Sequence, residues 1–345
     1  MRHHPTILQT ESLSVGYPAL GDLLSGLDLR LPAGQLCCLL GANGTGKSTL
    51  LRTLSGLHQP LSGQVKLYQK PLKHYKAKQL SQYLSLVLTQ QGTNQSLKVH
   101  ELVAMGRYPY TPWLGSLKKD DQVFIQRAMA DTGTLDLADR PLFELSDGER
   151  QKVMIARAMA QDTPLIILDE PTVHLDIPNR IDIVQLLSRL AHEHQKAVLM
   201  SSHDLELALQ SADQLWLIQQ DQIVSGIPED LLLQGKINKT FSGSNIRFDP
   251  QRGNFVLKNH ARHFVRFYAE GLLGQWTQHA LERCGFQVIT DRHADLSVDI
   301  QQTRPTPAWI LQSPSGSVLC HSLEALLKQL NLRLSAQKKK LKTEG

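Results

Sequence analysis

Long apolar runs and cysteines are both scarce in this chain of 345 residues. No apolar stretch approaches the ~20 residues that a membrane-spanning helix needs, so another chain must supply any membrane part of the function. The first residues lack an apolar h-region, and we expect no signal peptide. Of the four cysteines, Cys37 and Cys38 are neighbours in an apolar run, where side chains point to opposite faces, and no spacing resembles a zinc site. Reduced, buried thiols of a cytosolic protein fit this pattern.

What remains is an ordinary globular composition, with 41% hydrophobic and 20% charged residues. The length predicts two domains of roughly 100–200 residues each. The net charge of +5 is unevenly placed, because the residues after position 250 include thirteen Lys or Arg and seven Asp or Glu. This basic surplus is compatible with contact to nucleic acid, to anionic lipid, or to solvent alone.

Apolar spacing predicts an α/β protein with an open sheet. Short apolar runs bounded by Gly and Pro read as strands at Ile7–Val15, Leu24–Leu31 and Gln64–Tyr68. Continuous apolar runs of strand length, expected for strands buried on both faces, occupy residues 35–40, 84–88, 164–169 and 197–202. Helices are expected to begin at Lys47 and to cover residues 179–194.

Residues of about 92–152 have a different pattern. Val99–Gly106 and Asp120–Thr132 show helical spacing, and no convincing strand lies between them. We interpret this stretch as a helical insertion within a first domain that covers residues 1–245.

Turn-rich composition around residues 242–253 predicts a domain boundary. The following segment, 256–332, contains an amphipathic helix (272–284), strands near 286–290, 296–301 and 308–312, and a closing helix (322–330). This pattern predicts a small accessory α+β domain. The basic residues 333–345 are expected to form a disordered tail.

A glycine-rich loop joins the first continuous apolar run to the helix that begins at Lys47. Its residues are Gly41, Ala42, Asn43, Gly44, Thr45, Gly46, Lys47, Ser48 and Thr49. This is the phosphate-loop spacing in its strand–loop–helix context. Glycines allow successive backbone N–H groups to face phosphate oxygens, and the helix N-terminus adds partial positive charge. Lys47 then reaches the β- and γ-phosphates and Ser48 can bind Mg²⁺, so we predict that these nine residues bind ATP for hydrolysis.

A pair of carboxylates ends the apolar run Leu165–Leu168. Asp169 therefore lies at the carboxyl tip of a buried strand, where ligands bind in open α/β sheets. It suits Mg²⁺ coordination, and Glu170 suits a general base that polarises the attacking water. An apolar run ending in Asp-Glu is common by itself, but its combination with the phosphate loop indicates a nucleotide hydrolase.

Further motifs occur in a fixed order. Gln90 follows the strand at 84–88, the segment Leu145–Gln151 precedes the strand before Asp169, Asp176 follows Glu170, and His203 ends the strand at 197–202. With the phosphate loop and the Asp169–Glu170 pair, this order resembles the nucleotide-binding subunit of ATP-binding-cassette (ABC) transporters over roughly residues 5–240. The resemblance implies a P-loop (RecA-like) ATPase core with an N-terminal antiparallel β-subdomain and a helical insertion.

The resemblance also assigns roles to individual residues. Tyr17 would stack on adenine, Gln90 would contact Mg²⁺ and the attacking water, and His203 would hold the γ-phosphate. In a second copy of the chain, Ser146, Gly148 and Glu149 would complete the ATP site, and Asp176 would lie at the dimer interface. The implied metal ligands are Ser48, Gln90 and Asp169.

The segment that contains Ser146 departs from the family pattern. That pattern usually has two glycines and a Gln, whereas Asp147 and Glu149 occupy two of those places here. Acidic groups close to a triphosphate would repel it. We therefore expect Asp147 to point away from ATP at the start of a helix, where its charge favours the helix dipole.

Two stretches narrow the kind of transporter. Val99–Tyr110 and Leu175–Arg180 resemble the corresponding segments in importers of iron–siderophore complexes, haem and vitamin B12. In that group the helical insertion receives a short helix of the permease, so the surface beside Arg107 would carry coupling. The alternative interpretation of residues 107–110 is an ordinary aromatic turn that closes a helix.

The resemblance therefore implies an ATPase that energises import of a metal chelate, with iron–siderophore preferred over haem or cobalamin. Its partners would be integral-membrane permease subunits, a second copy of itself and, indirectly, a periplasmic or surface substrate-binding protein. The chain would act at the cytoplasmic face of the inner membrane, with no nucleic acid bound. The alternatives are an ABC-type ATPase that acts on nucleic acid or ribosomes through the basic C-terminal part, and a nucleotide switch without turnover.

The accessory domain extends beyond the minimal family pattern. A dimerisation or regulatory module is our main interpretation. Metal or haem sensing is an alternative, although the histidines and cysteines lack the spacing of ligand pairs. The residues concerned are His260, His263, His279, Cys284, His293, Cys320 and His321.

Overall fold

The structure is a computed structural model that describes residues 4–88, 96–111, 117–241, 246–249, 254–257, 263–290, 294–301 and 306–343. The chain forms two compact units. The first comprises residues 1–242 and 248–254, and the second comprises residues 243–247 and 255–345. The described residues contain no helix long and apolar enough to cross a membrane.

An antiparallel sheet opens the first unit. Its strands are β1 (Thr6–Tyr17), β2 (Gly21–Leu27), β3 (Arg30–Pro32), β5 (Ser62–Leu67) and β6 (Lys70–Pro71). The single strand predicted at 24–31 is therefore two strands. The chain leaves the ladder between them because the Leu29 N–H donates to the Thr10 hydroxyl and the Asp28 carboxylate accepts from the Ser12 N–H.

A six-stranded sheet forms the core of the first unit, in the order β11-β10-β4-β9-β8-β7. All of its neighbouring strands are parallel except β10 and β11. Their bounds are β4 (Leu36–Leu40), β7 (Leu84–Val87), β8 (Leu165–Leu168), β9 (Ala197–Ser202), β10 (Gln214–Gln219) and β11 (Gln222–Gly226). Every residue of β4, β8 and β9 is buried, as the continuous apolar runs predicted.

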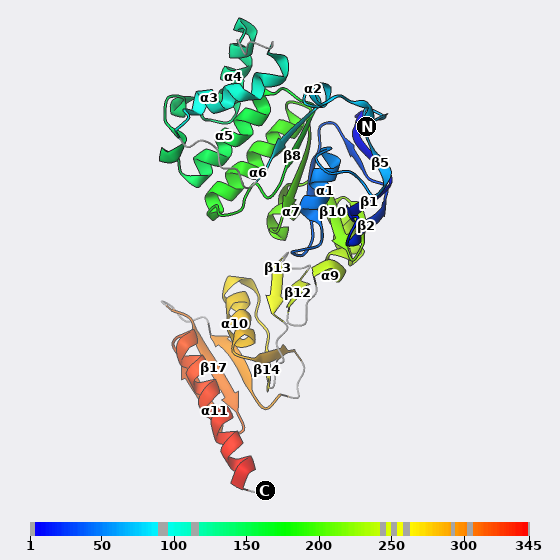
Figure 1. Ribbon diagram of the computed structural model, residues 1–345. Coiled ribbons are helices and arrows are strands. Elements are labelled where there is room, and N and C mark those ends of the chain that lie inside the picture. The colour runs from blue at the N-terminus through cyan, green and yellow to red at the C-terminus, as the bar shows by residue number, and fades with distance from the viewer. Residues whose placement is uncertain are drawn as a thin grey trace. The chain divides into compact units, whose positions relative to one another are not determined.

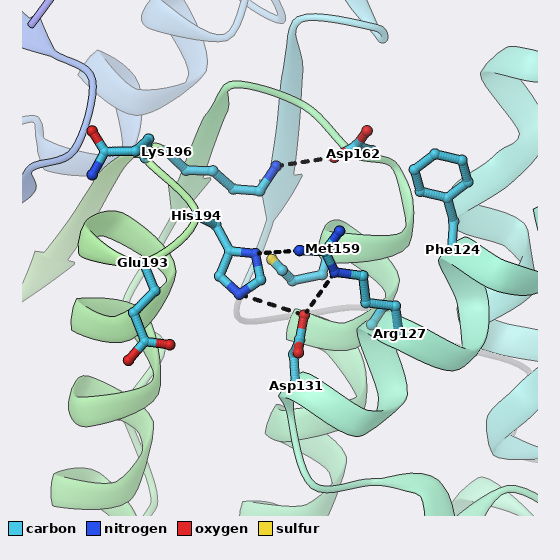
Figure 2. Close-up of a pocket in the computed structure, with 10 residues that line it drawn as sticks. Phe124, Arg127, Asp131, Met159, Asp162, Glu193, His194 and Lys196 are labelled. Atoms are coloured by element: carbon cyan, nitrogen blue, oxygen red, sulfur yellow. Dashed lines mark hydrogen bonds and ion pairs between the residues drawn. The ribbon is translucent and has the colours of Figure 1, made fainter.

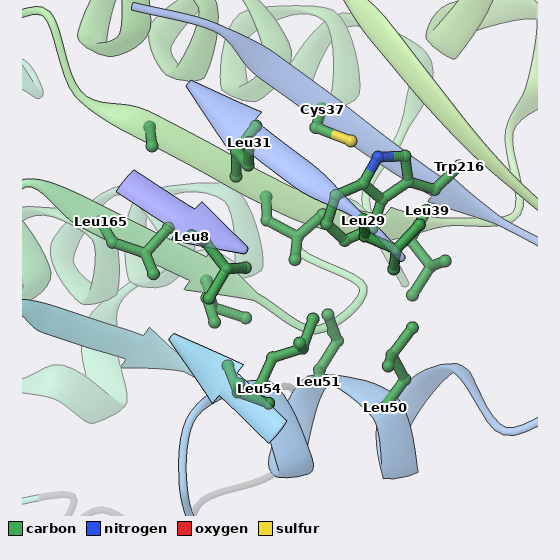
Figure 3. Close-up of a cluster of buried hydrophobic side chains, with 14 of the residues drawn as sticks. Leu8, Leu29, Leu31, Cys37, Leu39, Leu50, Leu51, Leu54, Leu165 and Trp216 are labelled. Carbon is green, nitrogen blue, oxygen red and sulfur yellow. The ribbon is translucent and has the colours of Figure 1, made fainter. Parts of the chain in front are cut away.

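Helix α1 (Lys47–Leu54) packs its apolar side into the largest core cluster. Leu50, Leu51 and Leu54 point from α1 toward Leu8 and Leu39, which come from the antiparallel and the parallel sheet respectively (Figure 3). The i, i+1, i+4 spacing of these leucines places them on one face of the helix. This packing fixes the position of α1, and with it the loop that precedes the helix.

The helices α3 (Val99–Ala104), α4 (Lys119–Asp131) and α5 (Asp147–Ala160) lie together at one end of the first unit (Figure 1). Short 3₁₀ segments lie between these helices in the sequence, at Met105–Tyr110, Leu135–Leu137 and Leu142–Glu144. We call residues 99–160 the helical region. Gly106 allows its chain to touch α5, since a Cβ there would lie 2.3 Å from the Arg157 carbonyl oxygen.

Arg107 is buried in the helical region, with only 5% of its surface exposed. Its Nε donates to Asp121 at 2.9 Å and its guanidinium also donates to the Ala160 carbonyl at 2.8 Å. The guanidinium carbon lies 4.0 Å and 4.2 Å from the ring centroids of Tyr110 and Phe124. Arg107 therefore ties the 3₁₀ segment to α4 and α5, and its side chain is not available at a coupling surface.

The remaining helices of the first unit connect or flank the strands. They are α2 (Ala77–Leu80), α6 (Ile177–His192), α7 (Leu205–Ser211), α8 (Pro228–Leu233) and α9 (Lys236–Phe241), with a 3₁₀ turn at Leu72–His74. The strands β12 (Ile246–Asp249) and β13 (Asn254–Leu257) pair with each other.

The second unit contains a five-stranded sheet in the order β15-β14-β16-β17-β18, with the helices α10 and α11. The bounds are β14 (His263–Phe267), α10 (Gly271–Arg283), β15 (Phe286–Ile289), β16 (Ser297–Gln301), β17 (Ala308–Ser313), β18 (Gly316–Cys320) and α11 (Leu323–Thr343). The sequence pattern did not predict β14 or β18. Helix α11 also continues through most of the segment predicted as a disordered tail, where Lys, Leu and Gln have high helix propensity.

The cysteines Cys37, Cys38 and Cys320 are buried, Cys284 is half-buried, and all four are free thiols. Burial raises the pKa of Cys37 and Cys38 well above the usual range, which keeps both unreactive. Within the described part of the chain, no cluster of His, Cys, Asp or Glu could hold a metal ion. Of the histidines considered for sensing, His260 and His293 lie outside the described residues.

Candidate active site

The phosphate loop leaves β4 and enters α1 through glycines in left-handed conformations. Gly44 has φ of 78° and Gly46 has φ of 96°, values that residues with a Cβ rarely adopt. Gly46 is also the N-cap of α1, and no side chain caps this helix end. The first N–H groups of α1 therefore face the loop without a side-chain acceptor, which is the arrangement that binds phosphate groups.

Lys47 lies under this loop with 5% of its surface exposed. Its ammonium donates to the carbonyl oxygens of Gly41 and Ala42 at 3.0 and 3.1 Å. Burial lowers the pKa of Lys47, and the nearby carboxylates of Glu170 and Asp169 oppose that shift. A cation held by two neutral carbonyl oxygens can exchange them for phosphate oxygens at little cost.

Asp169 and Glu170 follow β8 at the edge of the sheet where β4 ends, because parallel strands share their carboxyl edge. We call this the phosphate loop edge. Glu170 has φ of 50°, a left-handed conformation for a residue with a Cβ. Its backbone N–H donates to the Ser201 hydroxyl at 2.8 Å, and that hydroxyl donates to the Asp169 carboxylate at 2.7 Å. Both acidic residues are thus held by one serine of β9.

His203 follows β9 at the same edge. Its Nε2 lies 2.5 Å from a carboxylate oxygen of Glu170. The side chains of both residues are partly exposed, so both reach the solvent at the phosphate loop edge. The structure therefore brings together residues from three segments that are far apart in the sequence: Lys47, the pair Asp169 and Glu170, and His203.

Tyr17 ends β1 beside the start of α1. Its hydroxyl lies 3.4 Å from the hydroxyl of Thr49, and its ring centroid lies 5.1 Å from that of His58. About a third of Tyr17 is exposed (37%), so an aromatic surface borders the phosphate loop. Ser48 is half-buried in the first turn of α1, between Lys47 and Thr49.

Ser146 is the N-cap of α5, which places Asp147 in the first turn of a helix, as expected. Its hydroxyl accepts from the Glu149 N–H, and the Glu149 carboxylate accepts from the Ser146 N–H and hydroxyl at 2.8 and 2.9 Å. These bonds form a capping box. The Ser146 N–H, the Ser146 hydroxyl and then Arg140 and Lys152 lower the pKa of Glu149, against a smaller opposing effect of burial.

Asp147 is exposed in the first turn of α5, where its negative charge complements the helix dipole. Gly148 is buried against α6: a Cβ at this position would lie 2.7 Å from the Asn179 side-chain oxygen. Asn179 in turn donates twice to Asp176, the exposed N-cap of α6. Gly148 and Asp176 are therefore joined through one asparagine.

Gln90 lies outside the described residues. Sequence reasoning missed Ser201. The signal that could have found it is the presence of a polar residue within the apolar run before His203. A second missed residue is Arg180, which donates to the Leu175 carbonyl and forms an ion pair with Asp204. Arg180 connects the segment of Asp176 to the residue that follows His203.

A pocket of about 310 Å³ lies at the opposite, amino edge of the parallel strands, between the helical region and the sheet (Figure 2). Two pairs of charged or titratable groups meet there. Lys196 lies 3.4 Å from Asp162, and His194 lies 3.5 Å from Asp131. The strand ends that carry Asp169 and His203 point away from this pocket, which is therefore separate from the nucleotide site.

The parallel sheet, the phosphate loop with its lysine, and the acidic pair at the tip of β8 define a P-loop nucleotide-binding protein. Comparisons with known proteins narrow the class of protein further. The family described as ABC transporter matches residues 24–173, and the family described as iron ABC transporter C-terminal domain matches residues 261–331.

Curated relatives include the ferric enterobactin transport ATP-binding protein FepC of Escherichia coli (strain K12), 37% identical over 235 residues that cover 68% of this chain and 86% of FepC. The petrobactin import ATP-binding protein FpuD of Bacillus anthracis is 36% identical over 237 residues, which cover 68% of this chain and 86% of FpuD. Among solved structures, an inward-facing ABC transporter assigned to the metal-chelate type is 29% identical, with a TM-score of 0.61 and coverage of 68% and 89%.

This chain belongs to the ATP-binding subunits of ABC transporters. The P-loop ATPase fold, the activity of ATP hydrolysis and the resemblance to subunits of siderophore importers are thereby confirmed.

Proposed function

We propose that this chain hydrolyses ATP to energise import of an iron–siderophore complex through separate permease subunits. The observation that carries the proposal is the meeting of Lys47, Asp169, Glu170 and His203 beside an uncapped helix N-terminus. Relatives named for ferric enterobactin and petrobactin, and the match of residues 261–331 to a C-terminal domain of iron ABC transporters, support iron–siderophore over haem or cobalamin.

In the proposed reaction, the N–H groups of residues 42–48 and the Lys47 ammonium hold the β- and γ-phosphates. Tyr17 stacks on the adenine ring and His203 donates to the γ-phosphate. Glu170 accepts a proton from water as the water oxygen bonds to the γ-phosphorus and the bond to the bridging oxygen of ADP breaks. The left-handed backbone and the contact with His203 support this role, because both direct Glu170 toward the phosphate loop edge.

The residues around Lys47 also fit Mg²⁺, which prefers oxygen ligands. The Ser48 hydroxyl and the Asp169 carboxylate supply such oxygens, and Gln90 is the third proposed ligand. When bound, Mg²⁺ neutralises charge on the β- and γ-phosphates. Ser201 holds the Asp169 carboxylate at the strand tip, which supports its availability for this purpose.

We further propose that two copies of the chain enclose two ATP molecules. Ser146, Gly148 and Glu149 of one copy then face the phosphate loop of the other, and Asp176 lies at the interface. The exposure of Ser146 and Asp176, and the local hydrogen bonds that hold each of them, support a surface ready to be covered. We also retain the division into residues 1–245 with a helical part at about 92–152, and an accessory domain at 256–332.

The membrane-crossing part of this transporter is then a permease, which the ATPase joins at the cytoplasmic face of the inner membrane. An external substrate-binding protein delivers the chelate to the permease without touching this chain. ATP-driven closure of the two copies and opening after hydrolysis would switch the permease between its two orientations.

Uptake of radioactive ferric siderophores by a deletion strain tests the cargo. The strain receives the wild-type gene or the Glu170→Gln variant, and parallel cultures receive haem or cobalamin. We expect the wild type alone to restore siderophore uptake. The proposal would be contradicted if both genes restored siderophore uptake, or if only cobalamin or haem uptake were restored. It would also be contradicted if RNA or DNA stimulated the ATPase activity and the permease had no effect on it.

Mixing two inactive variants tests the shared site. Lys47→Ala lacks the phosphate-loop lysine, and Gly148→Asp places a bulky charge beside Asn179. If each site uses one loop and the other copy's Ser146, a mixed dimer contains one intact site, and mixing restores up to about half of the wild-type rate per mixed dimer. A site built within one copy predicts that the mixture stays inactive.

A further inference from the structure

Ser201 is one of two serines that end the otherwise apolar strand β9 at the centre of the parallel sheet; the other, Ser202, accepts from the Asp204 N–H. Ser201 lies between β4 and β8, it is paired with Leu39 in the β4 register, and none of its surface is exposed. Its hydroxyl accepts a hydrogen bond from the Glu170 backbone N–H and donates one to the Asp169 carboxylate. A single buried oxygen thus contacts both members of the acidic pair.

This pair of contacts requires a hydroxyl group. The Glu170 N–H is only a donor and an ionised carboxylate is only an acceptor, so the bridging atom must accept and donate at once. Alanine does neither, and cysteine does both weakly. The site is buried and has no room for a water molecule that could replace the hydroxyl. Without Ser201 the Glu170 N–H and the Asp169 carboxylate would lose a partner, and the backbone around them would move to recover hydrogen bonds.

The backbone that Ser201 contacts is in an unusual conformation. Glu170 adopts φ of 50°, which residues with a Cβ populate only when the surroundings hold them there. The hydrogen bond to Ser201 restrains the peptide between Asp169 and Glu170, so it acts on the directions of both side chains. On the far side, the Glu170 carboxylate meets His203, which is two residues after Ser201.

We propose that Ser201 is the positioning residue of the hydrolytic site, aligning the Glu170 carboxylate with the attacking water and Asp169 with the metal of the nucleotide. The inference rests on the roles proposed above for those two acids. None of the Ser201 surface is exposed, so its hydroxyl acts through Asp169 and Glu170. Its contribution is therefore to turnover and to the use of Mg²⁺, and not to affinity for the nucleotide itself.

The experiment compares Ser201→Ala and Ser201→Cys with wild type in steady-state ATPase assays over a range of ATP and Mg²⁺ concentrations. We expect kcat to fall about 10- to 100-fold in both, because small misplacement of catalytic groups has costs of that order. KM for ATP should stay within about 3-fold, as for a group that acts mainly in the transition state. The Mg²⁺ concentration for half-maximal turnover should rise, while a fluorescent ATP analogue in EDTA binds as to wild type.

Ser85→Ala is the matched control. Ser85 is a buried serine of β7 in the same sheet, and its hydroxyl accepts from Thr163 at the amino edge. This variant should lower the melting temperature about as much as Ser201→Ala but leave kcat near wild type. Cysteine fills the volume of serine, so equal losses in Ser201→Cys and Ser201→Ala attribute the effect to the hydrogen bonds.

Glu170→Gln in the same assay separates the two proposals. If Glu170→Gln retains turnover, Glu170 is not the general base, and the role of Ser201 in aligning Glu170 is overturned together with the proposed function. If Glu170→Gln is inactive while both Ser201 variants turn over at the wild-type rate with unchanged Mg²⁺ dependence, the role of Ser201 alone is overturned. An equal loss of kcat in Ser85→Ala would overturn it as well, because the effect would then be one of general stability.

Discussion

The phosphate loop edge and the start of α5 are both assigned to ATP, yet the protein holds them by different means. Lys47 and Asp169 are almost completely buried, and partners distant in sequence hold Asp169. Ser146 is exposed, and its capping bonds are to a residue three positions away. The first region is therefore preorganised by the tertiary fold, whereas the second is a local structure presented at the surface.

Two buried cations of this unit, Arg107 and Lys47, differ in a similar way. Arg107 is satisfied by Asp121, a carbonyl and two aromatic rings, so it has no capacity left for a ligand. Lys47 contacts two backbone carbonyls and lies near the carboxylates of Glu170 and Asp169, for which we propose roles toward water and Mg²⁺. Burial alone thus does not indicate function; what matters is whether a buried charge already has a charged partner of its own.

The variant with the largest expected effect loses ATP hydrolysis and keeps its fold. Glu170→Gln should lower kcat about 10²- to 10⁴-fold, the usual contribution of a general base. Its melting temperature should remain near wild type and a fluorescent ATP analogue should still bind. Loss of nucleotide binding together with turnover would show instead that Glu170 holds the loop.

The opposite outcome is expected in the helical region. Asp121→Asn leaves Arg107 buried without its anion, which should lower the free energy of unfolding by about 3 kcal/mol. Urea denaturation measures this loss. The protein that remains folded should bind the ATP analogue normally, and a fall in nucleotide affinity at unchanged stability would contradict the structural role of the pair.

A third variant tests whether the start of α5 serves catalysis from the surface. Gly148→Ala pushes a Cβ to 2.7 Å from the Asn179 side-chain oxygen, so α5 and the Asp176 segment must separate slightly. We expect kcat to fall about 10-fold through misplacement of Ser146, while a single copy binds the analogue as before. Gly226→Ala on β11, where a Cβ would be 3.2 Å from Leu231, is the control and should leave kcat unchanged.

The smallest effect concerns the capping box. Hydrogen bonds to Ser146 lower the pKa of Glu149 in the folded protein, so the carboxylate stabilises α5 at neutral pH. This contribution is complete above the usual glutamate pKa of about 4.3 and is lost as pH falls through the lower folded-state value. Because Glu149 is about a third exposed, we expect Glu149→Ala to cost only about 1 kcal/mol at pH 7.

Glu149→Gln is the matched variant for this last prediction, since a Gln side chain also completes a capping box. It should keep most of the stability at pH 7 and lose the acid dependence that the wild type shows as pH falls below the usual glutamate pKa of about 4.3. Urea unfolding of wild type and both variants across this range measures the difference. Identical acid dependence in wild type and Glu149→Gln would exclude Glu149 as its source.

Much of the fold was predictable because its signals are local. Continuous apolar runs located β4, β8 and β9, and the glycine spacing of residues 41–48 placed the phosphate loop between a strand and a helix. The start of α5 at Ser146 was expected only from the resemblance to ABC subunits, although its capping bonds are local. By contrast, β14 and β18 went unpredicted, because short half-exposed strands depend on the neighbours with which they pair.

The sequence by itself determined where a phosphate loop and an acidic strand tip form, because both are set by backbone geometry over a few residues, and on that basis it predicted which residues would carry the chemistry. Only the tertiary structure decided how they are held. Ser201 contacts Asp169 and Glu170 because β9 lies beside β8, and Arg107 is buried because α4 and α5 close over it. Such contacts join residues far apart in the chain, and their energies depend on a strand order and helix packing that no local spacing specifies.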